Sequence, residues 1–347
     1  MSSTPISFVV CGIGRIGKRH AKIISEYQGA ELAAVIDADP NQEKGLAGMG
    51  VKVPCYQSLQ DYLDNHTPGE NADVINICVP NGLHAPLAVK ALNLGFHTVI
   101  EKPMALSRKQ CEEVIEASEK SKKKVFVVKQ NRYSPPSRWL KSVIDDRRLG
   151  EIYLVEINCL WNRDERYYKK DDWHGTLAMD GGTLFTQFSH FVDIMYWVFG
   201  DVTDISARFR NFNHRSMIEF EDTGIVNFRF RNGGEGTLHY STSCWDKNME
   251  SSMTVIGEKG SLKIGGQYMD EITYCHIEGY EMPELEPTNP PNDYGPFTGS
   301  AANHHYVIEN VVDTLNGKTE ITTGAEEGMM VVDIIERMYR DRLKVQS

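Results

Sequence analysis

The chain has 347 residues, of which 41% are hydrophobic and 24% charged, an ordinary composition for a soluble protein long enough to form two domains. Its net charge of −11 at pH 7 argues against nucleic acid or an anionic membrane as partner. The seven cysteines are scattered without a Cys-x-x-Cys pair, and neither a signal peptide nor a bilayer-spanning run is apparent. We therefore expect reduced thiols and a cytoplasmic protein.

The first elements predict a nucleotide-binding turn. An apolar run at 6–11 is followed by Gly-Ile-Gly-Arg-Ile-Gly at 12–17. In such a strand–turn–helix the first glycine allows the tight turn, the second lets the backbone approach a pyrophosphate, and the third lets the helix pack on the strand. The unpaired N–H groups at the helix start would bind the phosphates. The residues expected at the dinucleotide are Gly12, Ile13, Gly14, Arg15, Ile16 and Gly17.

A second apolar strand ends at an acidic residue, Asp37, at the distance from the glycines that a ribose contact requires. A carboxylate there can accept both ribose hydroxyls and would repel a 2′-phosphate, so NAD is favoured over NADP. The alternative interpretation is a tight strand-to-helix turn that binds nothing.

Short β-rich runs alternate with helical stretches up to about residue 130. After the first strand, further strands are expected at 32–37, 74–79, 98–100 and 125–129, and helices at 86–94 and 107–123. This alternation predicts a doubly wound parallel sheet with ligands at the carboxyl ends of the strands. We therefore predict an α/β protein in which residues 1–130 form an NAD-binding Rossmann domain.

Beyond residue 130 the pattern changes to short strands joined by hairpin-like turns. Strands are expected at 152–160, 205–212, 223–230, 236–243, 252–256 and 261–264, a helix at 182–199, a long loop at 280–299, and helices at 302–315 and 324–343. We predict that residues 131–347 form a second α/β domain with an open, mostly antiparallel sheet that binds the substrate.

Four short strings occur together in the chain. They are the glycine loop, Cys78-Val-Pro-Asn-Gly-Leu-His84, Glu101-Lys102-Pro103 after a strand, and Gly181-Gly182 leading to His190 and Asp193 on one helix. In order and spacing the chain resembles the glucose-fructose oxidoreductase and inositol dehydrogenase (Gfo/Idh/MocA) family over essentially its whole length.

Within that family the chain looks most like the UDP-N-acetylglucosaminuronate 3-dehydrogenases of bacterial surface-polysaccharide pathways, such as lipopolysaccharide O-antigen biosynthesis. The closer likeness rests on Val128-Lys-Gln-Asn-Arg-Tyr133, Leu160-Trp-Asn-Arg163 with Tyr167-Tyr168 and Trp173, Gln187-Phe-Ser-His190 and Glu221-Asp-Thr-Gly-Ile-Val-Asn227. The resemblance implies NAD as cofactor and a UDP-sugar as substrate. It also implies a homo-oligomer, tetramer or dimer, assembled through the open sheet, and a pathway aminotransferase that acts on the product.

Lys102 is a candidate catalytic residue. It follows a strand and precedes a proline, which gives its amine a rigid mount near the nicotinamide, where it can hydrogen-bond the hydroxyl being oxidised. The alternative is a surface lysine paired with Glu101. The resemblance also places Asn81, His84, Glu101 and Lys102 itself beside the cofactor, although turn-making and capping are the ordinary roles of Asn81 and His84.

His190 is the second catalytic candidate, because Thr186 and Asp193 lie near the same helical face and Gln187 adjoins them. The family commonly has an aspartate at the position of Thr186, and the uronate dehydrogenases tend to an asparagine. Since a threonine does not take up a proton, the substrate proton would pass to His190 or Lys102. For His190 alone, the default interpretation is a satisfied buried histidine.

An acidic sugar nucleotide needs local cationic and polar groups in a chain this acidic. Arg163 is the candidate for the uronate carboxylate, because a guanidinium can bind it through two parallel hydrogen bonds, although lone arginines are usually solvated. The other expected substrate contacts are Lys129, Asn131, Thr186, Gln187, Ser189 and His190. No Cys/His/Asp group has metal-ligand spacing, so no metal is predicted.

The expected reaction is NAD-dependent oxidation of the 3-hydroxyl of an acidic UDP-sugar, UDP-N-acetylglucosaminuronate, to its 3-oxo form. One alternative is an NAD-dependent dehydrogenase of another sugar or polyol, and a reductase that works the same site backwards is a further one. The last alternative is a non-catalytic NAD-binding sensor, against which the presence of both Lys102 and His190 argues.

Overall fold

The structure, a computed structural model, describes residues 4–66, 72–169, 173–293, 295 and 297–340. The chain divides into two compact units, one formed by the residues up to Lys129 with His304–Val332, the other by Gln130–Asn303 with the chain from Asp333 on. The sequence pattern places His304–Val332 in the second domain, and the structure places it in the first unit. There the Val127 N–H donates to the Thr323 carbonyl at 3.0 Å, and the Thr323 hydroxyl donates to the Val127 carbonyl at 2.5 Å.

The first unit contains a six-stranded sheet in the order β3-β2-β1-β4-β5-β6, in which every pair is parallel. The strands are β1 (Ile6–Cys11), β2 (Ala30–Ile36), β3 (Cys55–Tyr56), β4 (Val74–Ile77), β5 (His97–Ile100) and β6 (Val125–Val127). Because the strand order reverses between β1 and β4, a crevice for a dinucleotide is expected at the carboxyl ends of these two strands. The predicted parallel Rossmann sheet is confirmed.

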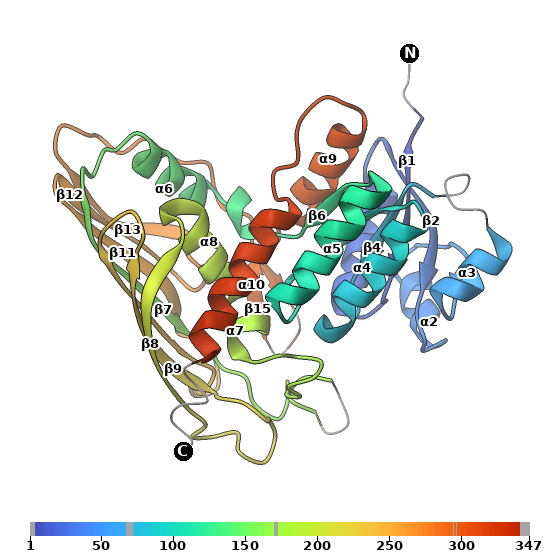
Figure 1. Ribbon diagram of the computed structural model, residues 1–347, viewed down its shortest axis with the longest axis horizontal. Helices are drawn as coiled ribbons and strands as arrows, with labels where there is room; N and C mark the ends of the chain where they lie inside the picture. The colour runs from blue at the N-terminus through green and yellow to red at the C-terminus, as the bar shows by residue number, and fades with distance from the viewer. Residues whose placement is uncertain (1–3, 67–71, 170–172, 294, 296, 341–347) are drawn as a thin grey trace. The chain divides into compact units, whose positions relative to one another are not determined.

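Helices complete the first unit. They are α1 (Arg15–Glu26), α2 (Gln42–Ala47), α3 (Leu59–Asn65), η1 (Asn81–Leu83), α4 (His84–Asn93), α5 (Arg108–Ser121) and α9 (His304–Leu315). Helix α4 packs beside α5, as Figure 1 shows, and α9 packs against α1. Helix α10 (Ala325–Arg340) begins in this unit and ends in the other.

The second unit contains a seven-stranded sheet in the order β13-β12-β11-β7-β10-β9-β8. Its strands are β7 (Ile152–Leu160), β8 (Val202–Arg210), β9 (Thr223–Phe230), β10 (Glu235–Ser241), β11 (Glu250–Gly257), β12 (Gly260–Gly265) and β13 (Glu271–Ile277). The β7–β10 pair is parallel and the other pairs are antiparallel, which confirms the mostly antiparallel sheet.

One face of this sheet is covered and the other is open. Along β9, Val226, Phe228 and Phe230 are buried while Asn227 and Arg229 between them are exposed. Figure 1 shows α6 (Pro135–Asp145) and α8 (Ser189–Phe199) together on one side of the sheet. In the part of the chain that the structure describes, every helix is too short or too polar to cross a membrane.

Several local features differ from the sequence expectations. The helix expected at 182–199 is divided into α7 (Thr183–Thr186) and α8, because the Phe188 N–H bonds five residues back to Thr183 and widens the turn. The loop expected at 280–299 holds β14 (Pro291–Asp293), paired with β15 (Thr298–Ala301). Residues 341–343 of the last expected helix lie outside the described residues. Helix α6 and strand β13 were not expected.

Candidate active site

The glycine turn after β1 has the geometry of a phosphate cradle. Gly12 has φ +88°, and a Cβ there would lie 2.5 Å from the Cys78 carbonyl oxygen, while a Cβ on Gly17 would lie 1.8 Å from the Gly12 oxygen. A Cβ on Gly14 would meet no atom within 4 Å, so the backbone is open at this point. Helix α1 starts at Arg15 with no side-chain cap on its N–H groups. These residues therefore fit a dinucleotide pyrophosphate at the helix N-terminus.

Asp37 stands directly beside this turn. Its Oδ2 accepts a hydrogen bond from the Ile13 N–H at 2.5 Å, and its Oδ1 accepts one from the Asp39 N–H at 2.9 Å. The carboxylate is partly exposed at the carboxyl end of β2, one strand from the glycine turn. This is the place from which an acidic side chain reaches the ribose of a dinucleotide.

The segment that carries Lys102 is braced by His84. Lys102 follows β5, and its peptide bond to Pro103 is cis. His84 directs Nδ1 to the Pro103 carbonyl at 2.6 Å and Nε2 to the Val79 carbonyl at 2.8 Å. Burial lowers the pKa of His84, so the neutral ring carries one N–H and donates to one of these carbonyls. Both ring nitrogens thus face the backbone, while Asn81 is buried nearby in η1.

A buried network that sequence reasoning missed surrounds Glu101. Its Oε1 accepts from His20 Nε2 at 2.8 Å and lies 3.7 Å from His304 Nε2, while its Oε2 accepts from the Lys102 N–H at 3.1 Å. Burial alone would raise the pKa of Glu101, but the hydrogen bond from His20 and the nearby positive charge of Lys102 outweigh it and hold that pKa far below its usual range. The carboxylate next to Lys102 is therefore ionised.

One potential ligand atom from each of His20, Glu101 and His304 lies within 4.8 Å of the other two. Histidine nitrogens and carboxylate oxygens are also the ligands of many metal sites. However, the Asn76 amide donates to Nδ1 of His20 at 2.9 Å, so Nε2 carries the proton that His20 donates to Glu101. With this tautomer, hydrogen bonds hold the carboxylate and the His20 ring without an ion.

In the second unit, a buried acidic residue fixes the start of α7. The Tyr339 hydroxyl donates to Glu221 at 2.6 Å and accepts from the Leu184 N–H at 2.9 Å. The Thr183 hydroxyl donates to the Glu221 carbonyl at 2.5 Å. A Cβ on Gly182, which has φ +135°, would lie 2.5 Å from the Tyr339 oxygen. The Gly-Gly string is therefore needed for this close approach.

Helix α8 is held by η2 (Gln130–Tyr133) through two polar pairs. Arg132 donates to Asp193 twice, from Nε at 2.9 Å and from Nη2 at 2.7 Å. The Gln130 amide lies 3.1 Å from Nε2 of His190. All four side chains are buried. The segment around Gln130 therefore anchors α8, the helix that carries His190.

Arg163 and Gln187, two expected substrate contacts, bind one another. Arg163 Nε donates to Gln187 Oε1 at 3.0 Å, and Nη1 donates to Asn248 Oδ1 at 3.2 Å. The guanidinium also stacks against three aromatic rings, those of Trp161, Tyr167 and Phe297. Arg163 is 3% exposed and is therefore a buried arginine, not a solvated one on the surface.

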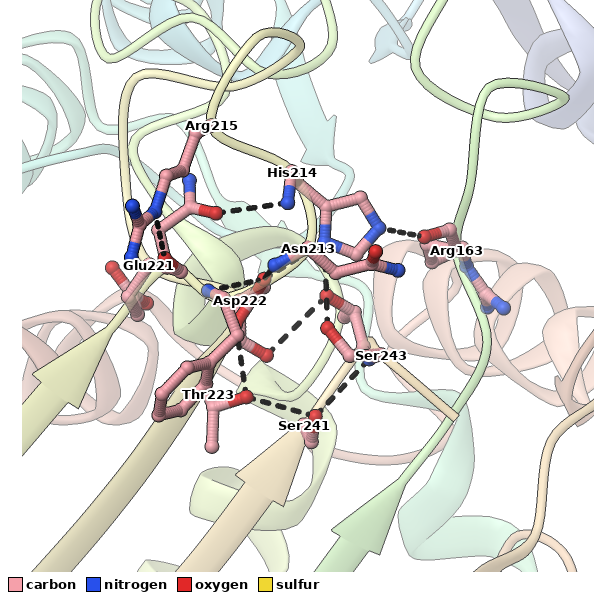
Figure 2. Close-up of polar contacts among 12 residues, drawn as sticks. Arg163, Asn213, His214, Arg215, Glu221, Asp222, Thr223, Ser241 and Ser243 are labelled. Carbon is pink, nitrogen blue, oxygen red and sulfur yellow. Dashed lines mark hydrogen bonds and ion pairs between the residues drawn. The ribbon is translucent and has the colours of Figure 1, made fainter. Parts of the chain in front are cut away.

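The backbone of Arg163 is fixed by a second polar cluster. Figure 2 shows the His214 ring with Nε2 directed at the Arg163 carbonyl oxygen, 2.5 Å away, and Nδ1 directed at Asp222, 3.0 Å away. Asp222 also accepts from the N–H groups of Phe212 and Asn213, at 2.9 and 2.7 Å. Burial alone would raise the pKa of Asp222, but these hydrogen bonds lower it well below its usual range.

Thr186 binds a carboxylate of its own unit. Its hydroxyl contacts both the side chain and, at 3.1 Å, the carbonyl oxygen of Asp180. Asp180 is buried, and its other carboxylate oxygen accepts from the Gly175 N–H at 2.7 Å. The family that the chain resembles commonly has an aspartate at the position of Thr186. In this chain a carboxylate also lies at that position, but Asp180 supplies it.

Several polar atoms on these elements have no hydrogen-bond partner among the described residues. They are Oε1 of Gln130, Oδ1 of Asn131, Nε2 of Gln187 and Oγ of Ser189, and all are buried. Buried polar groups are normally paired with protein, water or a ligand. Within the second unit they are therefore free donors and acceptors for a polar ligand or water. Lys129, the last residue of the first unit before Gln130, is 2% exposed.

Comparison with known proteins assigns both units to one family. Residues 6–129 match the oxidoreductase family with an NAD-binding Rossmann fold, and residues 137–263 match the GFO/IDH/MocA C-terminal domain. The chain belongs to the GFO/IDH/MocA oxidoreductase family. It is an NAD-dependent dehydrogenase of this sugar and polyol oxidoreductase family, so the predicted resemblance, enzyme class and cofactor are confirmed.

Two similar solved structures are WlbA dehydrogenases in complex with NADH and UDP-GlcNAcA. The one from Bordetella pertussis is 31% identical, with 97% of each chain covered and a TM-score of 0.85. The one from Chromobacterium violaceum is 30% identical, with 99% of this chain and 95% of the other covered and a TM-score of 0.88. The inositol 2-dehydrogenase of Rhizobium meliloti is 24% identical over 96% of both chains.

Proposed function

We propose that this dehydrogenase oxidises the 3-hydroxyl of UDP-N-acetylglucosaminuronate to the 3-oxo sugar. The observation that carries the proposal is Arg163, a buried guanidinium held by Gln187 and aromatic rings in a chain of net charge −11. A cation in such a setting suits an anionic group such as a uronate carboxylate. The UDP-GlcNAcA bound to two relatives of 30–31% identity gives independent support.

Each unit supplies part of the chemistry. NAD, held at residues 12–17 and Asp37, supplies the hydride acceptor. His190 takes the proton of the 3-hydroxyl, and Lys102 donates a hydrogen bond to the same oxygen. Thr186, whose hydroxyl is bound to Asp180, orients the sugar without taking a proton. The remaining proposed contacts are Asn81, His84 and Glu101 on the cofactor side and Lys129, Asn131, Arg163, Gln187 and Ser189 on the substrate side.

The test is a single-turnover reaction. Equimolar protein and NAD⁺ are mixed with UDP-N-acetylglucosaminuronate, and the absorbance of NADH is followed. The mass of the sugar product is then measured by mass spectrometry. We expect a burst of NADH and a product lighter by two hydrogens. Because single turnover detects NADH that stays bound, an absent burst with tightly bound NAD⁺ contradicts the proposed substrate.

Variants test the assigned residues. Lys102→Ala and His190→Asn should each lower turnover by about 10²–10⁴-fold with nucleotide binding intact. The control substitutions Lys109→Ala, on the exposed side of α5, and His305→Asn should leave turnover unchanged. Normal activity in the Lys102→Ala, His190→Asn double variant overturns the assignment.

A second candidate is a neutral polyol or sugar, which the inositol 2-dehydrogenase relative favours. The same assay with inositol and glucose separates the two candidates, since an acid-binding site should discriminate strongly against both. A sensor that binds NAD without chemistry would give NADH with none of the three.

The proposed pathway role follows from the product. A 3-oxo sugar is the substrate of a pyridoxal-phosphate aminotransferase, so in surface-polysaccharide biosynthesis such as that of the O-antigen we propose this class of enzyme as the next step. We also propose a homo-oligomer, tetramer or dimer, that acts in the cytoplasm. Light scattering coupled to gel filtration measures the oligomer directly.

A further inference from the structure

His214 is a buried histidine whose two ring nitrogens both face oxygen atoms. Nε2 lies 2.5 Å from the carbonyl oxygen of Arg163, and Nδ1 lies 3.0 Å from Oδ2 of Asp222 (Figure 2). Both His214 and Asp222 are 0% exposed. A neutral ring has one bare nitrogen, whose lone pair would point at one of these oxygens, whereas an imidazolium donates a hydrogen bond to each.

Asp222 supplies the opposite charge that a buried imidazolium requires. Its Oδ2 also accepts from two backbone N–H groups, at 2.9 and 2.7 Å, and its Oδ1 accepts from the Thr223 hydroxyl at 2.9 Å. These donors favour the ionised carboxylate, so its contact with His214 is an ion pair. The Ser243 hydroxyl, 3.5 Å from Nδ1, lies farther from the ring than the carboxylate does.

His84 shows what the carboxylate changes. The ring of His84 also faces two acceptors, the carbonyl oxygens of Pro103 and Val79, but neither carries a charge. Burial lowers the pKa of His84, and its ring is neutral. The two buried histidines therefore differ because the ring of His214 contacts an anion.

The other ionisable groups around His214 have partners of their own or are neutral. In the segment after β7, Asp164 pairs with Arg166, which lowers the pKa of this carboxyl. The Tyr168 ring lies 5.6 Å from the His214 ring, and burial raises the pKa of Tyr168 well above its usual range, so it carries no charge. In the loop of His214 itself, Arg215 directs Nε to a backbone carbonyl.

The backbone of Arg163 is bound on both sides. Its N–H donates to the Thr242 carbonyl at 2.8 Å, and its carbonyl oxygen accepts from His214. We propose that His214 is an imidazolium at neutral pH and a positioning residue, whose Nε2–H fixes Arg163 for the carboxylate of the substrate. Loss of that proton would turn a lone pair toward the carbonyl oxygen, and the guanidinium would move with its backbone. The step from Arg163 to the substrate rests on the proposed function.

The first test needs no substrate. Protein labelled with ¹⁵N-histidine is compared by NMR as wild type and Asp222→Asn over a pH series, with His214→Gln used to assign the signals. We expect both nitrogens of His214 to be protonated in the wild type at pH 7. In Asp222→Asn one proton should leave at lower pH, because a neutral amide stabilises the imidazolium less. A wild-type ring with one bare nitrogen at pH 7 overturns the proposal.

Two substitutions separate the two contacts of the ring. In His214→Gln the amide N–H takes the place of Nε2–H and can still reach the Arg163 carbonyl. In His214→Asn the shorter amide takes the place of Nδ1–H and can reach Asp222 alone. His276→Asn, at an exposed position of β13, is the matched control.

We expect His214→Asn to raise KM for UDP-N-acetylglucosaminuronate about 10- to 100-fold, with a smaller change in kcat, and His214→Gln to recover most of that loss. The preference over neutral UDP-N-acetylglucosamine should fall as KM rises. In the wild type, KM should also rise at the pH where NMR shows the loss of one ring proton, and His214→Gln should lack this rise. A KM raised tenfold or more in His214→Gln overturns the positioning role, whether or not His214→Asn folds.

A measurement on Arg163 itself separates this inference from the proposed function. The Arg163 Nε–H donates to Gln187 in a buried place, so in ¹⁵N-arginine spectra it should exchange slowly with water. Exchange should stay slow in His214→Gln and become faster in His214→Asn, with Arg163→Lys used to assign the signal. If the wild type does not oxidise UDP-N-acetylglucosaminuronate, the proposed function fails, whereas the exchange rates still decide whether His214 fixes Arg163. Faster exchange in His214→Gln contradicts the inference.

Discussion

Arg163 donates from Nε to the amide oxygen of Gln187 across 3.0 Å, and the two form one buried pair although they come from separate strings of the sequence. The pair fixes one edge of the guanidinium. It also connects the loop after β7, where Arg163 lies, to the junction of α7 and α8. The cation is therefore held in place before any ligand arrives, which lowers the entropy lost on binding.

Arg163→Lys should raise KM for UDP-N-acetylglucosaminuronate about 10- to 100-fold, the value of one charge-assisted hydrogen-bonded contact. A lysine keeps the charge but does not form two parallel bonds to a carboxylate. The discrimination against neutral UDP-N-acetylglucosamine should fall in proportion. Steady-state kinetics with both sugars measures this, and Arg148→Lys, at a half-exposed position, is the control. Equal effects on both sugars would contradict a carboxylate contact.

Thr186→Val should lower the free energy of unfolding by about 1–3 kcal/mol, because the buried Asp180 loses a hydroxyl donor. Asp180→Asn in the same chain should recover part of the loss, since an amide is cheaper to bury than a charge. Urea unfolding of the single and double variants measures the coupling between the two residues. Thr273→Val, on the exposed strand β13, controls for the loss of a hydroxyl. Additive effects would show that the two side chains do not interact.

The sequence predicted those features of the site that depend on residues close together in the chain. The glycine turn, the acidic end of β2 and the string at Lys102 each follow from local geometry. The break at Phe188 was missed, because it depends on one widened turn in an otherwise helical pattern.

The contacts that hold these features in place were not predictable. Glu101 binds His20, and Gln130 binds His190, across long stretches of chain. Each partner looks like an isolated polar residue until the fold brings them together. Arg163 is the clearest case, because its burial under aromatic rings distinguishes it from a solvated arginine, and no pattern in the sequence reports burial of that kind.

Asp222 should contribute to stability in a pH-dependent way. The pKa of this carboxyl is lowered in the folded protein, so its contribution is complete above the unfolded-state value of about 3.9 and is lost as pH falls below that value. Asp222→Asn should lower the free energy of unfolding of the second unit at pH 7. Below pH 4 the free energy of unfolding of the variant should fall less steeply with pH than that of the wild type. All five tryptophans lie between residues 139 and 245, so their fluorescence in urea reports this unit alone. If the variant loses stability below pH 4 as steeply as the wild type does, other carboxyl groups cause that loss.

Asp37→Ser should weaken the preference for NAD over NADP by about tenfold or more. The Ile13 N–H holds the carboxylate beside the glycine turn, where its charge would repel a 2′-phosphate. Two like charges about 4 Å apart repel by roughly 1–4 kcal/mol near a protein surface. Titration calorimetry with both nucleotides gives the ratio. Asp61→Ser, in the first turn of α3, is the control. An unchanged ratio would place the ribose elsewhere.

Gly14→Ala and Gly17→Ala separate a dinucleotide site from a simple tight turn. A Cβ at Gly17 would lie 1.8 Å from the Gly12 backbone oxygen, so that variant should lose about 1–3 kcal/mol of stability whether or not NAD is present. A Cβ at Gly14 meets no atom within 4 Å, and φ there is −68°, so that variant should lose less than about 1 kcal/mol. It should nevertheless raise the Kd for NAD by roughly tenfold or more, because the added methyl stands where the backbone approaches the pyrophosphate. Thermal unfolding with and without NAD, together with calorimetry, measures both effects. Normal NAD affinity in Gly14→Ala would mean that the open backbone at this glycine does not face the phosphates.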